Sequence, residues 1–187
     1  MSELTKLRVM SIDPGTNSLG LSVHELNITH GTMVVLDAYT VNVPRVMNLY
    51  CADTLFYQDE RVAKLKAVEY AVANYARSWE IERAVSEAPY MGKFPAAYAA
   101  LVSCINAIRS GCSNYDSTLY LDIIDPATVK KMLGVPGNSG DKSLIAKAIE
   151  KSETIDTSLI DLSDMDEHSL DSIAVGHAYF RLNYLMG

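Results

Sequence analysis

Hydrophobic residues change their spacing several times along the chain, and each spacing predicts a structural element. Three early segments, 7–12, 20–26 and 32–43, are short, apolar and rich in Val, Leu and Tyr, which is typical of strands. Turn-forming residues at 17–18 and 30–31 separate the three segments. Connections this short predict that the strands follow one another as an antiparallel meander.

Later segments alternate between helical and strand spacing. Between 59 and 81, apolar residues recur every three or four positions with charged residues between them, as in an amphipathic helix. Further helices are predicted at 95–108, at 127–133 behind Pro126, from about 141 to 151, and from about 163 to 185. The last of these is expected to start at Ser163 or Asp164, with Asp166 or Glu167 completing a capping box.

Two short apolar segments, 83–87 and 119–124, are predicted to be the fourth and fifth strands. The chain order predicts an α/β protein: a central mixed five-stranded sheet, made of a three-strand antiparallel meander plus two parallel strands and flanked by helices. Segment 44–58 has no clear period. The whole of 1–187 is expected to form a single domain.

The composition narrows the class of protein. Apolar residues make up 49% of the 187 residues, which is enough for one full core. No apolar run approaches the about 20 residues that span a membrane, and the first residues show no secretory signal. We therefore expect no membrane partner. The three cysteines show no C-x-x-C spacing, which predicts reduced thiols and a cytoplasmic location. The expected cytoplasm is that of a bacterium, with a phage gene as a possible source.

The charge is unevenly distributed. The formal net charge is −7, which argues against a general electrostatic grip on nucleic acid. Lysines gather in 126–151, whereas 152–171 carries acids and no Lys or Arg. Two interpretations remain open: two solvated faces of unlike sign, or a phosphate-binding surface beside a metal site.

Carboxylates stand at the ends of two predicted strands. Asp13 ends the first strand and is followed by a sharp Pro14-Gly15 turn, and Glu87 ends the fourth. A carboxylate placed like Asp13 can hold a hard metal ion or lie beside the phosphates of a nucleotide. If both strands are central and parallel, the two carboxylates emerge at the same edge of the sheet, where open sheets bind ligands.

The last predicted helix adds His168 and Asp171, which are three residues apart and so share a face. Such a set suits phosphodiester cleavage, because two hard cations about 3.5–4 Å apart stabilise both the attacking and the leaving oxygen. Mg²⁺ prefers carboxylate oxygens and water, and a histidine ligand shifts the preference toward Mn²⁺. The acid on the central strand, Asp13, is the expected bridge between the two ions.

These residues occur in motifs that resemble those of the RuvC-type Holliday junction resolvases, within the ribonuclease-H-like superfamily. The resemblance covers roughly 7–184. It is carried by Ile12-Asp13-Pro14-Gly15, by Ser86-Glu87-Ala88-Pro89-Tyr90-Met91, by Val129-Lys130-Lys131 with the following Gly-Asn-Ser-Gly-Asp141-Lys142-Ser143, and by His168-Ser-Leu-Asp171-Ser-Ile-Ala174-Val175.

The resemblance implies a role for each position. Two Mg²⁺ ions per active site would be held by four residues: Asp13, Glu87, His168 and Asp171. Mn²⁺ would also support activity. Lys130 and Lys142 would approach the scissile phosphates, with Lys142 counted among the catalytic residues, and Lys131 belongs to the same DNA-binding region. Tyr90 would stack at the branch point. For Lys130 and Lys131 the alternative is a solvated helix face, and for Tyr90 the alternative is a position in the core.

The apolar helix at 95–108 is either a central core helix or, as the resemblance implies, part of a homodimer interface. A two-fold axis would supply two sites for nicking two strands. The chain departs from the family in three respects: its acidic charge, which favours recognition by branch shape; segment 44–58, which has no counterpart; and Asp166 and Glu167, which are alternative ligands beside His168.

The leading hypothesis is a divalent-metal-dependent endonuclease that resolves four-way DNA junctions by paired symmetric nicks, with no small-molecule cofactor. A related nuclease acting on RNA or other branched DNA is the first alternative. An actin-like ATPase would need a second, similar half, and 187 residues show no repeat. A non-catalytic junction-binding protein is the last alternative, although all four ligand positions carry side chains able to bind metal.

Overall fold

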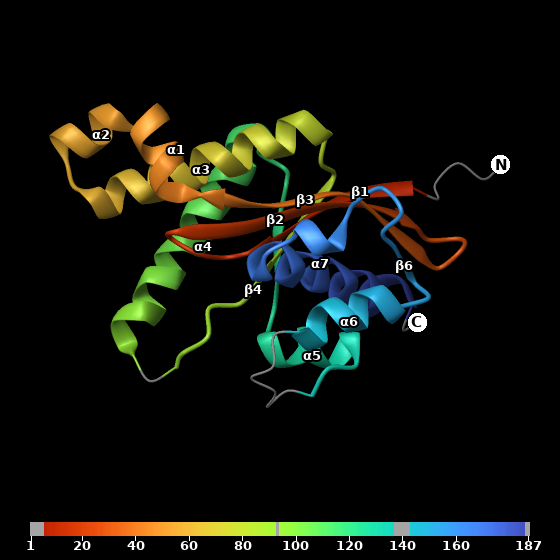
Figure 1. Ribbon diagram of the computed structural model, residues 1–187. Coiled ribbons are helices and arrows are strands. Elements are labelled where there is room, and N and C mark those ends of the chain that lie inside the picture. The colour runs from red at the N-terminus through yellow and green to blue at the C-terminus, as the bar shows by residue number, and fades with distance from the viewer. Residues whose placement is uncertain (1–5, 93, 137–142, 186–187) are drawn as a thin grey trace.

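A central sheet with helices on both faces organises the chain (Figure 1). A computed structural model describes residues 6–92, 94–136 and 143–185. In chain order the elements are β1 (Lys6–Asp13), β2 (Ser18–Asn27), β3 (Thr32–Asn42), α1 (Val43–Tyr50), α2 (Ala52–Tyr57), α3 (Glu60–Trp79), β4 (Arg83–Glu87), α4 (Pro95–Tyr115), β5 (Leu121–Ile124), α5 (Pro126–Leu133), α6 (Ser143–Lys151), β6 (Ile155–Asp156), the 3₁₀ helix η1 (Leu162–Asp164), α7 (Glu167–Phe180) and the π-helical turn η2 (Arg181–Leu185).

The sheet order is β5-β4-β1-β2-β3-β6. The first three strands pair antiparallel, while β4 pairs parallel with β1 and β5 parallel with β4. The predicted mixed sheet, with three antiparallel strands followed by two parallel ones, is therefore confirmed. The predicted number of strands is wrong, because the two-residue strand β6 adds a sixth strand beside Met33 and Val34, and two residues are too few to produce a recognisable pattern.

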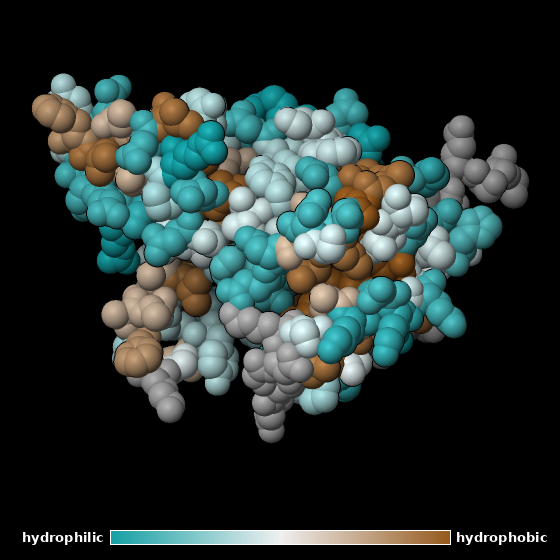
Figure 2. Space-filling model, in the orientation of Figure 1, coloured by the Kyte–Doolittle hydropathy of each residue, from teal (hydrophilic) through white to brown (hydrophobic). Residues whose placement is uncertain are grey.

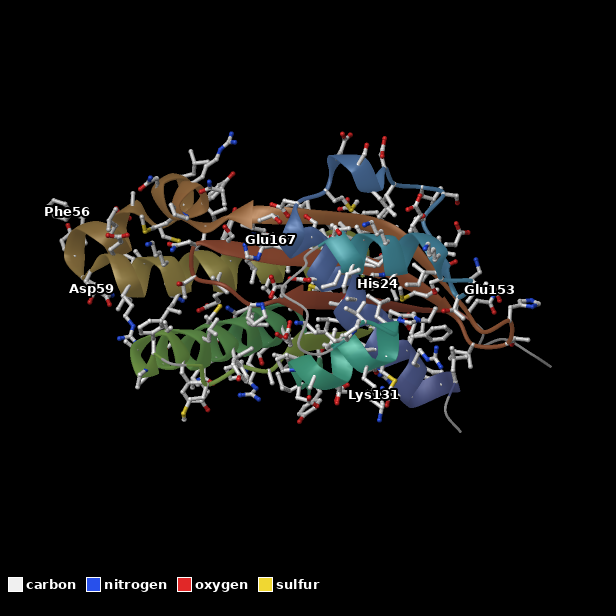
Figure 3. The ribbon with its side chains drawn as sticks, turned by 60° about the horizontal axis from the view of Figure 1, so that its bottom comes forward. His24, Phe56, Asp59, Lys131, Glu153 and Glu167 are labelled. Atoms are coloured by element: carbon white, nitrogen blue, oxygen red, sulfur yellow. The ribbon has the colours of Figure 1, made fainter. Side chains whose placement is uncertain are left out.

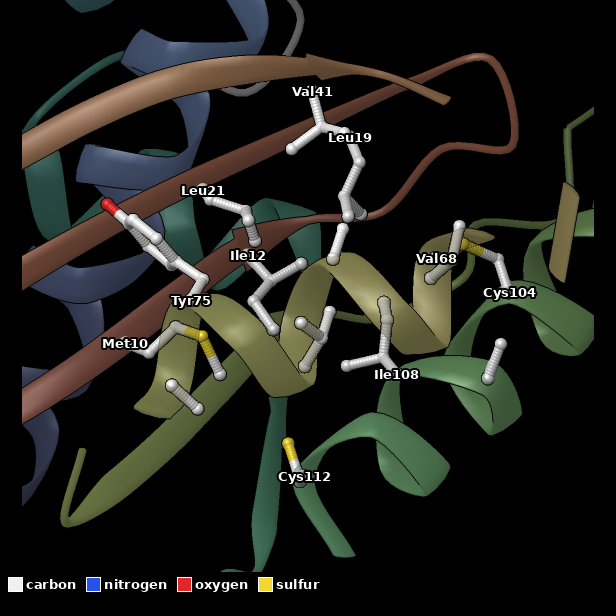
Figure 4. Packing of buried hydrophobic residues seen from close by; sticks show 14 of the residues in the cluster. Met10, Ile12, Leu19, Leu21, Val41, Val68, Tyr75, Cys104, Ile108 and Cys112 are labelled. Carbon is white, nitrogen blue, oxygen red and sulfur yellow. The ribbon is translucent and has the colours of Figure 1, made fainter. Parts of the chain in front are cut away.

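Two helical layers cover the two faces of the sheet. The helices α3 and α4 pack against each other over one face, and α7 lies across the other face with α5 and α6 beside it (Figure 1). On the first face, Ile12 from β1, Val68 from α3 and Ile108 from α4 belong to one buried cluster (Figure 4). Because β1 and β4 are covered on both sides, their side chains are buried almost throughout, which is the pattern of central strands.

The helix α7 approaches the sheet closely through Gly176. A Cβ at this position would collide with the His24 imidazole, which is held between the hydroxyls of Ser11 and Ser22. Burial lowers the pKa of His24 to about 3, so the ring is neutral in the core. The small residue therefore sets the depth at which α7, and with it His168, lies on the sheet.

Several predicted boundaries need correction. Segment 44–58, which has no clear period in the sequence, forms two short helices, α1 of eight residues and α2 of six. The helix predicted at 95–108 continues to Tyr115. The last helix does not start at Ser163 or Asp164, because those residues form the separate turn η1 and Asp166 caps α7. Over the described residues, no helix is long and apolar enough to cross a membrane.

Candidate active site

The carboxylates of Asp13 and Glu87 lie side by side at one edge of the sheet. The strands β1 and β4 run parallel, and Ile12 pairs with Ser86, so the next residue along each strand is the acid. Both acids are the last residues of their strands. The parallel register that the strand pattern predicted therefore brings two distant carboxylates to the carboxyl ends of neighbouring strands.

The first turn of α7 reaches this edge because position 20 is a glycine. Gly20 pairs with Asp13 across β1 and β2, and a Cβ there would collide with the carbonyl oxygen of His168. The Nδ1 atom of His168 lies 2.7 Å from Oδ2 of Asp13. This hydrogen bond, together with the nearby charges of Asp13, Asp166 and Asp171, raises the pKa of His168.

A second set of hydrogen bonds anchors the start of α7. Asp166 caps the helix by accepting from the backbone N–H and the hydroxyl of Ser169, each at 3.0 Å. The hydroxyl of Thr40, on β3, also donates to the Asp166 carboxylate. Asp166 therefore serves the helix terminus, and the next residue, Glu167, lies at the start of α7 (Figure 3).

The surroundings of Glu87 shift the pKa of its carboxyl group strongly upward. Burial, followed by the negative charges of Asp13 and Asp171, raises the pKa of Glu87 to about 8, although the ammonium of Lys130 opposes this rise. Asp171 thus acts on both Glu87 and His168. The structure accordingly brings Asp13, Glu87, His168, Asp171 and Lys130 into one electrostatic cluster.

The chemistry of this cluster fits a hard divalent cation. Three carboxylates and one imidazole supply the oxygen-rich donor set that Mg²⁺ or Mn²⁺ prefers. Burial and the charges of Asp13 and Asp171 both disfavour the ionised form of Glu87, and a bound cation would favour it. Among the described residues, no three His, Cys, Asp or Glu side chains are arranged closely enough to hold one metal ion. His168 and Asp13 form a hydrogen bond with each other instead. Cation binding would therefore compete with this hydrogen bond.

The predicted DNA-binding residues have different positions. Tyr90 follows β4 and its side chain is 71% exposed, so the alternative of a core position is wrong. Lys130 lies on α5, near enough to Glu87 to act on it, whereas Lys131 is exposed on the same helix (Figure 3). Lys142 lies outside the described residues.

Three supporting residues were not identified from the sequence. Gly20 allows the close approach of α7, and Thr40 holds the helix cap. The buried thiol of Cys104, on α4, lies beside the Gly15 backbone in the turn after Asp13. Their roles depend on contacts between segments far apart in the chain. The only available signal was a glycine inside a predicted strand, which indicates a close backbone approach.

The sequence matches no protein-family model and no curated protein. The structure matches "T. thermophilus RuvC in complex with Holliday junction substrate" with a TM-score of 0.67 at 15% identity, over 97% of this chain and 96% of that one. The yeast mitochondrial Holliday junction resolvase Ydc2 gives a TM-score of 0.68 at 11% identity, over 94% of this chain and 78% of that one. The fowlpox virus Holliday junction resolvase gives 0.54 at 14% identity, over 94% and 99%. The likeness confirms the predicted ribonuclease-H-like fold in the arrangement that RuvC has.

Proposed function

We propose that this chain is a divalent-metal-dependent endonuclease that resolves four-way DNA junctions by paired symmetric nicks. One observation carries the proposal: Asp13, Glu87, His168 and Asp171 form one electrostatic cluster at the carboxyl edge of the sheet. The cluster occurs in a fold shared with two Holliday junction resolvases at TM-scores of 0.67 and 0.68. The fold supports the class of chemistry, and the cluster supports the metal dependence.

In the proposed mechanism these four side chains would hold two Mg²⁺ or Mn²⁺ ions. Bound there, the ions would stabilise charge on the attacking and leaving oxygens and acidify the attacking water. Asp13 is the proposed bridging ligand, because it lies between the Glu87 carboxylate on the neighbouring strand and His168 on α7. Lys130, already close to Glu87, would approach the phosphates, and Lys142 is proposed to do the same.

Branch recognition is proposed to depend on Tyr90. Its ring is exposed just beyond the end of β4, so it can stack on an unpaired base at the branch point. The net charge of −7 disfavours strong binding to plain duplex. Stacking at a branch and phosphate contacts near the site therefore account for selectivity better than general charge does.

A homodimer is proposed to place two such sites on one junction. The N-terminal part of α4 is largely exposed, whereas Cys104, Ile105 and Ile108 in its middle are buried against the core. Figure 2 shows apolar side chains at the exposed end of α4 and over α2. A second copy covering the exposed half of α4 would supply the two-fold axis. Sedimentation at micromolar concentration is expected to show a dimer, and a monomer would contradict this assignment.

The decisive experiment is a nuclease assay on four-way, three-way, flap, duplex and RNA–DNA hybrid substrates, each with Mg²⁺, Mn²⁺ or EDTA. We expect symmetric nicks in the four-way junction with either metal ion and none in EDTA. Preferential cleavage of the hybrid would favour the alternative of a nuclease acting on RNA. Junction binding without cleavage in either metal ion would overturn the enzyme proposal.

A further inference from the structure

A cleft of about 310 Å³ opens beside the turn between β1 and β2. Its lining comes from three elements that meet there: the turn, the first two turns of α3, and α4. The lining residues are Thr16, Glu60, Arg61, Lys64, Leu65 and Ala100. None of them belongs to the carboxylate cluster, and the turn that contributes Thr16 begins directly after Asp13.

The two cationic side chains in this cleft are held in place by neutral acceptors. The Nζ atom of Lys64 donates to Oδ1 of Asn17, at 2.9 Å, which draws the lysine from α3 across to the turn. The Nη2 atom of Arg61 donates to the hydroxyl of Ser103 on α4, at 3.1 Å. Such tethers reduce the entropy that two long side chains would lose on binding an anion.

The positive charge in the cleft is only partly neutralised. Lys64 lies 2.7 Å from the Glu60 carboxylate, which is itself 64% exposed. Within 6–92, 94–136 and 143–185, Arg61 forms no ion pair. The lining thus carries two cations against one acid, on a chain whose formal net charge is −7.

The position of the cleft relates it to the carboxylate cluster. Thr16 is three residues from Asp13, so their Cα atoms are at most about 11 Å apart. A DNA strand places one phosphate per roughly 3.4 Å of helix axis, so the cleft lies within a few phosphates of Asp13. Lys130 lies on the α7 face of the sheet and Arg61 on the α3 face, so the two basic groups flank the carboxylate edge from opposite sides.

We propose that this cleft binds backbone phosphates of the DNA strand next to the cleaved bond, with Arg61 and Lys64 as the cationic contacts and Thr16 as a hydroxyl donor. The inference rests on the proposed nuclease function and adds a second phosphate site to it, across the edge of the sheet from Lys130. Arg61 suits this role because its planar group offers several donors in a fixed geometry.

The test uses the full chain with Asp13→Asn as the non-cleaving parent. Fluorescence anisotropy measures its binding to a fluorescein-labelled four-way junction between 50 and 200 mM KCl. Arg61→Gln combined with Lys64→Gln is expected to weaken binding about tenfold at 100 mM KCl. The slope of log affinity against log salt should fall by about one to two, since each lost phosphate contact removes about 0.9.

Lys66→Gln is the matched control, because Lys66 lies on the same helix but pairs with Glu69 at 2.9 Å and does not line the cleft. It should bind as the parent does, and Lys64→Arg should retain most of the affinity. If the double variant unfolds, Arg61→Gln alone must still reduce the slope by about one. An unchanged slope and affinity in a folded variant would overturn the phosphate site alone, whereas a parent that does not bind junctions would overturn the proposed function.

Discussion

His168 Nδ1 lies 2.7 Å from Asp13 Oδ2, and this contact joins the last helix to the end of the first strand across 155 positions of sequence. The hydrogen bond raises the pKa of His168 and engages the carboxylate proposed to bridge two cations. A cation can bind a ring nitrogen of His168 only when that nitrogen carries no proton. Metal binding and the protonation of His168 are therefore expected to oppose each other.

The first prediction concerns Asp13→Asn. Loss of the carboxylate should reduce cleavage of a four-way junction by at least about 100-fold, because even residues that only support metal ligands contribute 10–100-fold. Binding should be retained, since Asp13 is not a proposed phosphate contact. Gel-based cleavage and anisotropy measure the two properties separately. Wild-type cleavage by this variant would be incompatible with a metal role for Asp13.

The second prediction concerns the pH dependence of stability. The pKa of Glu87 is raised from 4.5 to about 8 in the folded protein, so the folded state retains a proton that the unfolded state has lost. Between these two values the unfolded chain binds fewer protons at this site, and stability must fall as pH rises. In EDTA, Glu87→Gln should remove at least about 1.4 kcal/mol of that loss between pH 5 and pH 8, the value of one pKa unit.

Urea denaturation at both pH values measures this difference, and Mg²⁺ should reduce it by supplying positive charge. Glu153→Gln, which removes an exposed carboxyl from the loop after α6, is the matched control. If Glu87→Gln leaves the pH dependence of the unfolding free energy as in the wild type, the pKa of Glu87 is not raised in the folded protein.

The third prediction concerns Gly20→Ala. The added methyl group would collide with the His168 carbonyl oxygen and lie 3.1 Å from the Asp13 Cβ, so α7 must shift. We expect a loss of about 1–3 kcal/mol in the free energy of unfolding, as for other overpacked sites, together with reduced cleavage. Gly92→Ala is the control, because a Cβ there meets only the Tyr90 ring at 3.8 Å. Equal stability of the two variants would contradict the close approach of α7.

The sequence predicted the site well where ligands stand at the ends of strongly patterned strands. Asp13 and Glu87 could be placed because apolar periodicity defines β1 and β4, and parallel pairing then fixes their common edge. The supports of His168 were not predicted, since Thr40 acts through a contact with no local signal and Gly20 shows only a glycine inside a predicted strand. The short elements β6 and α2 were missed for a different reason, because two and six residues span too few repeats of a strand or helix period to form a recognisable pattern.

The fourth prediction concerns Tyr90→Ala. The side chain is 71% exposed, so its removal should leave the melting temperature nearly unchanged. Junction cleavage should fall, since stacking on a base contributes about 1–3 kcal/mol. Tyr120→Ala is the matched control, because Tyr120 is 73% exposed and lies before β5. Equal cleavage by both variants would remove Tyr90 from branch recognition, and a large loss of stability would contradict its exposed position.

The fifth prediction separates a structural cap from a positioning residue. Asp166→Ala removes the cap of α7 and the Thr40 contact, which should reduce the free energy of unfolding by about 0.5–2 kcal/mol. Because His168 stands two residues further on, its orientation toward Asp13 should also loosen. Cleavage at limiting Mg²⁺ should fall by about 10–100-fold, as is typical when residues that orient metal ligands are lost.

The control for this variant is Asp161→Ala, which removes a cap of the same charge from the turn η1, where Asp161 accepts from Ser163 at 2.9 Å. A mere loss of stability should be similar in the two variants. The Mg²⁺ concentration that gives half-maximal cleavage should rise only for Asp166→Ala, and Thr40→Val should move it in the same direction. If saturating Mg²⁺ fails to restore cleavage, Asp166 does not act through metal affinity, and if both aspartate variants shift the metal dependence alike, Asp166 acts only on folding.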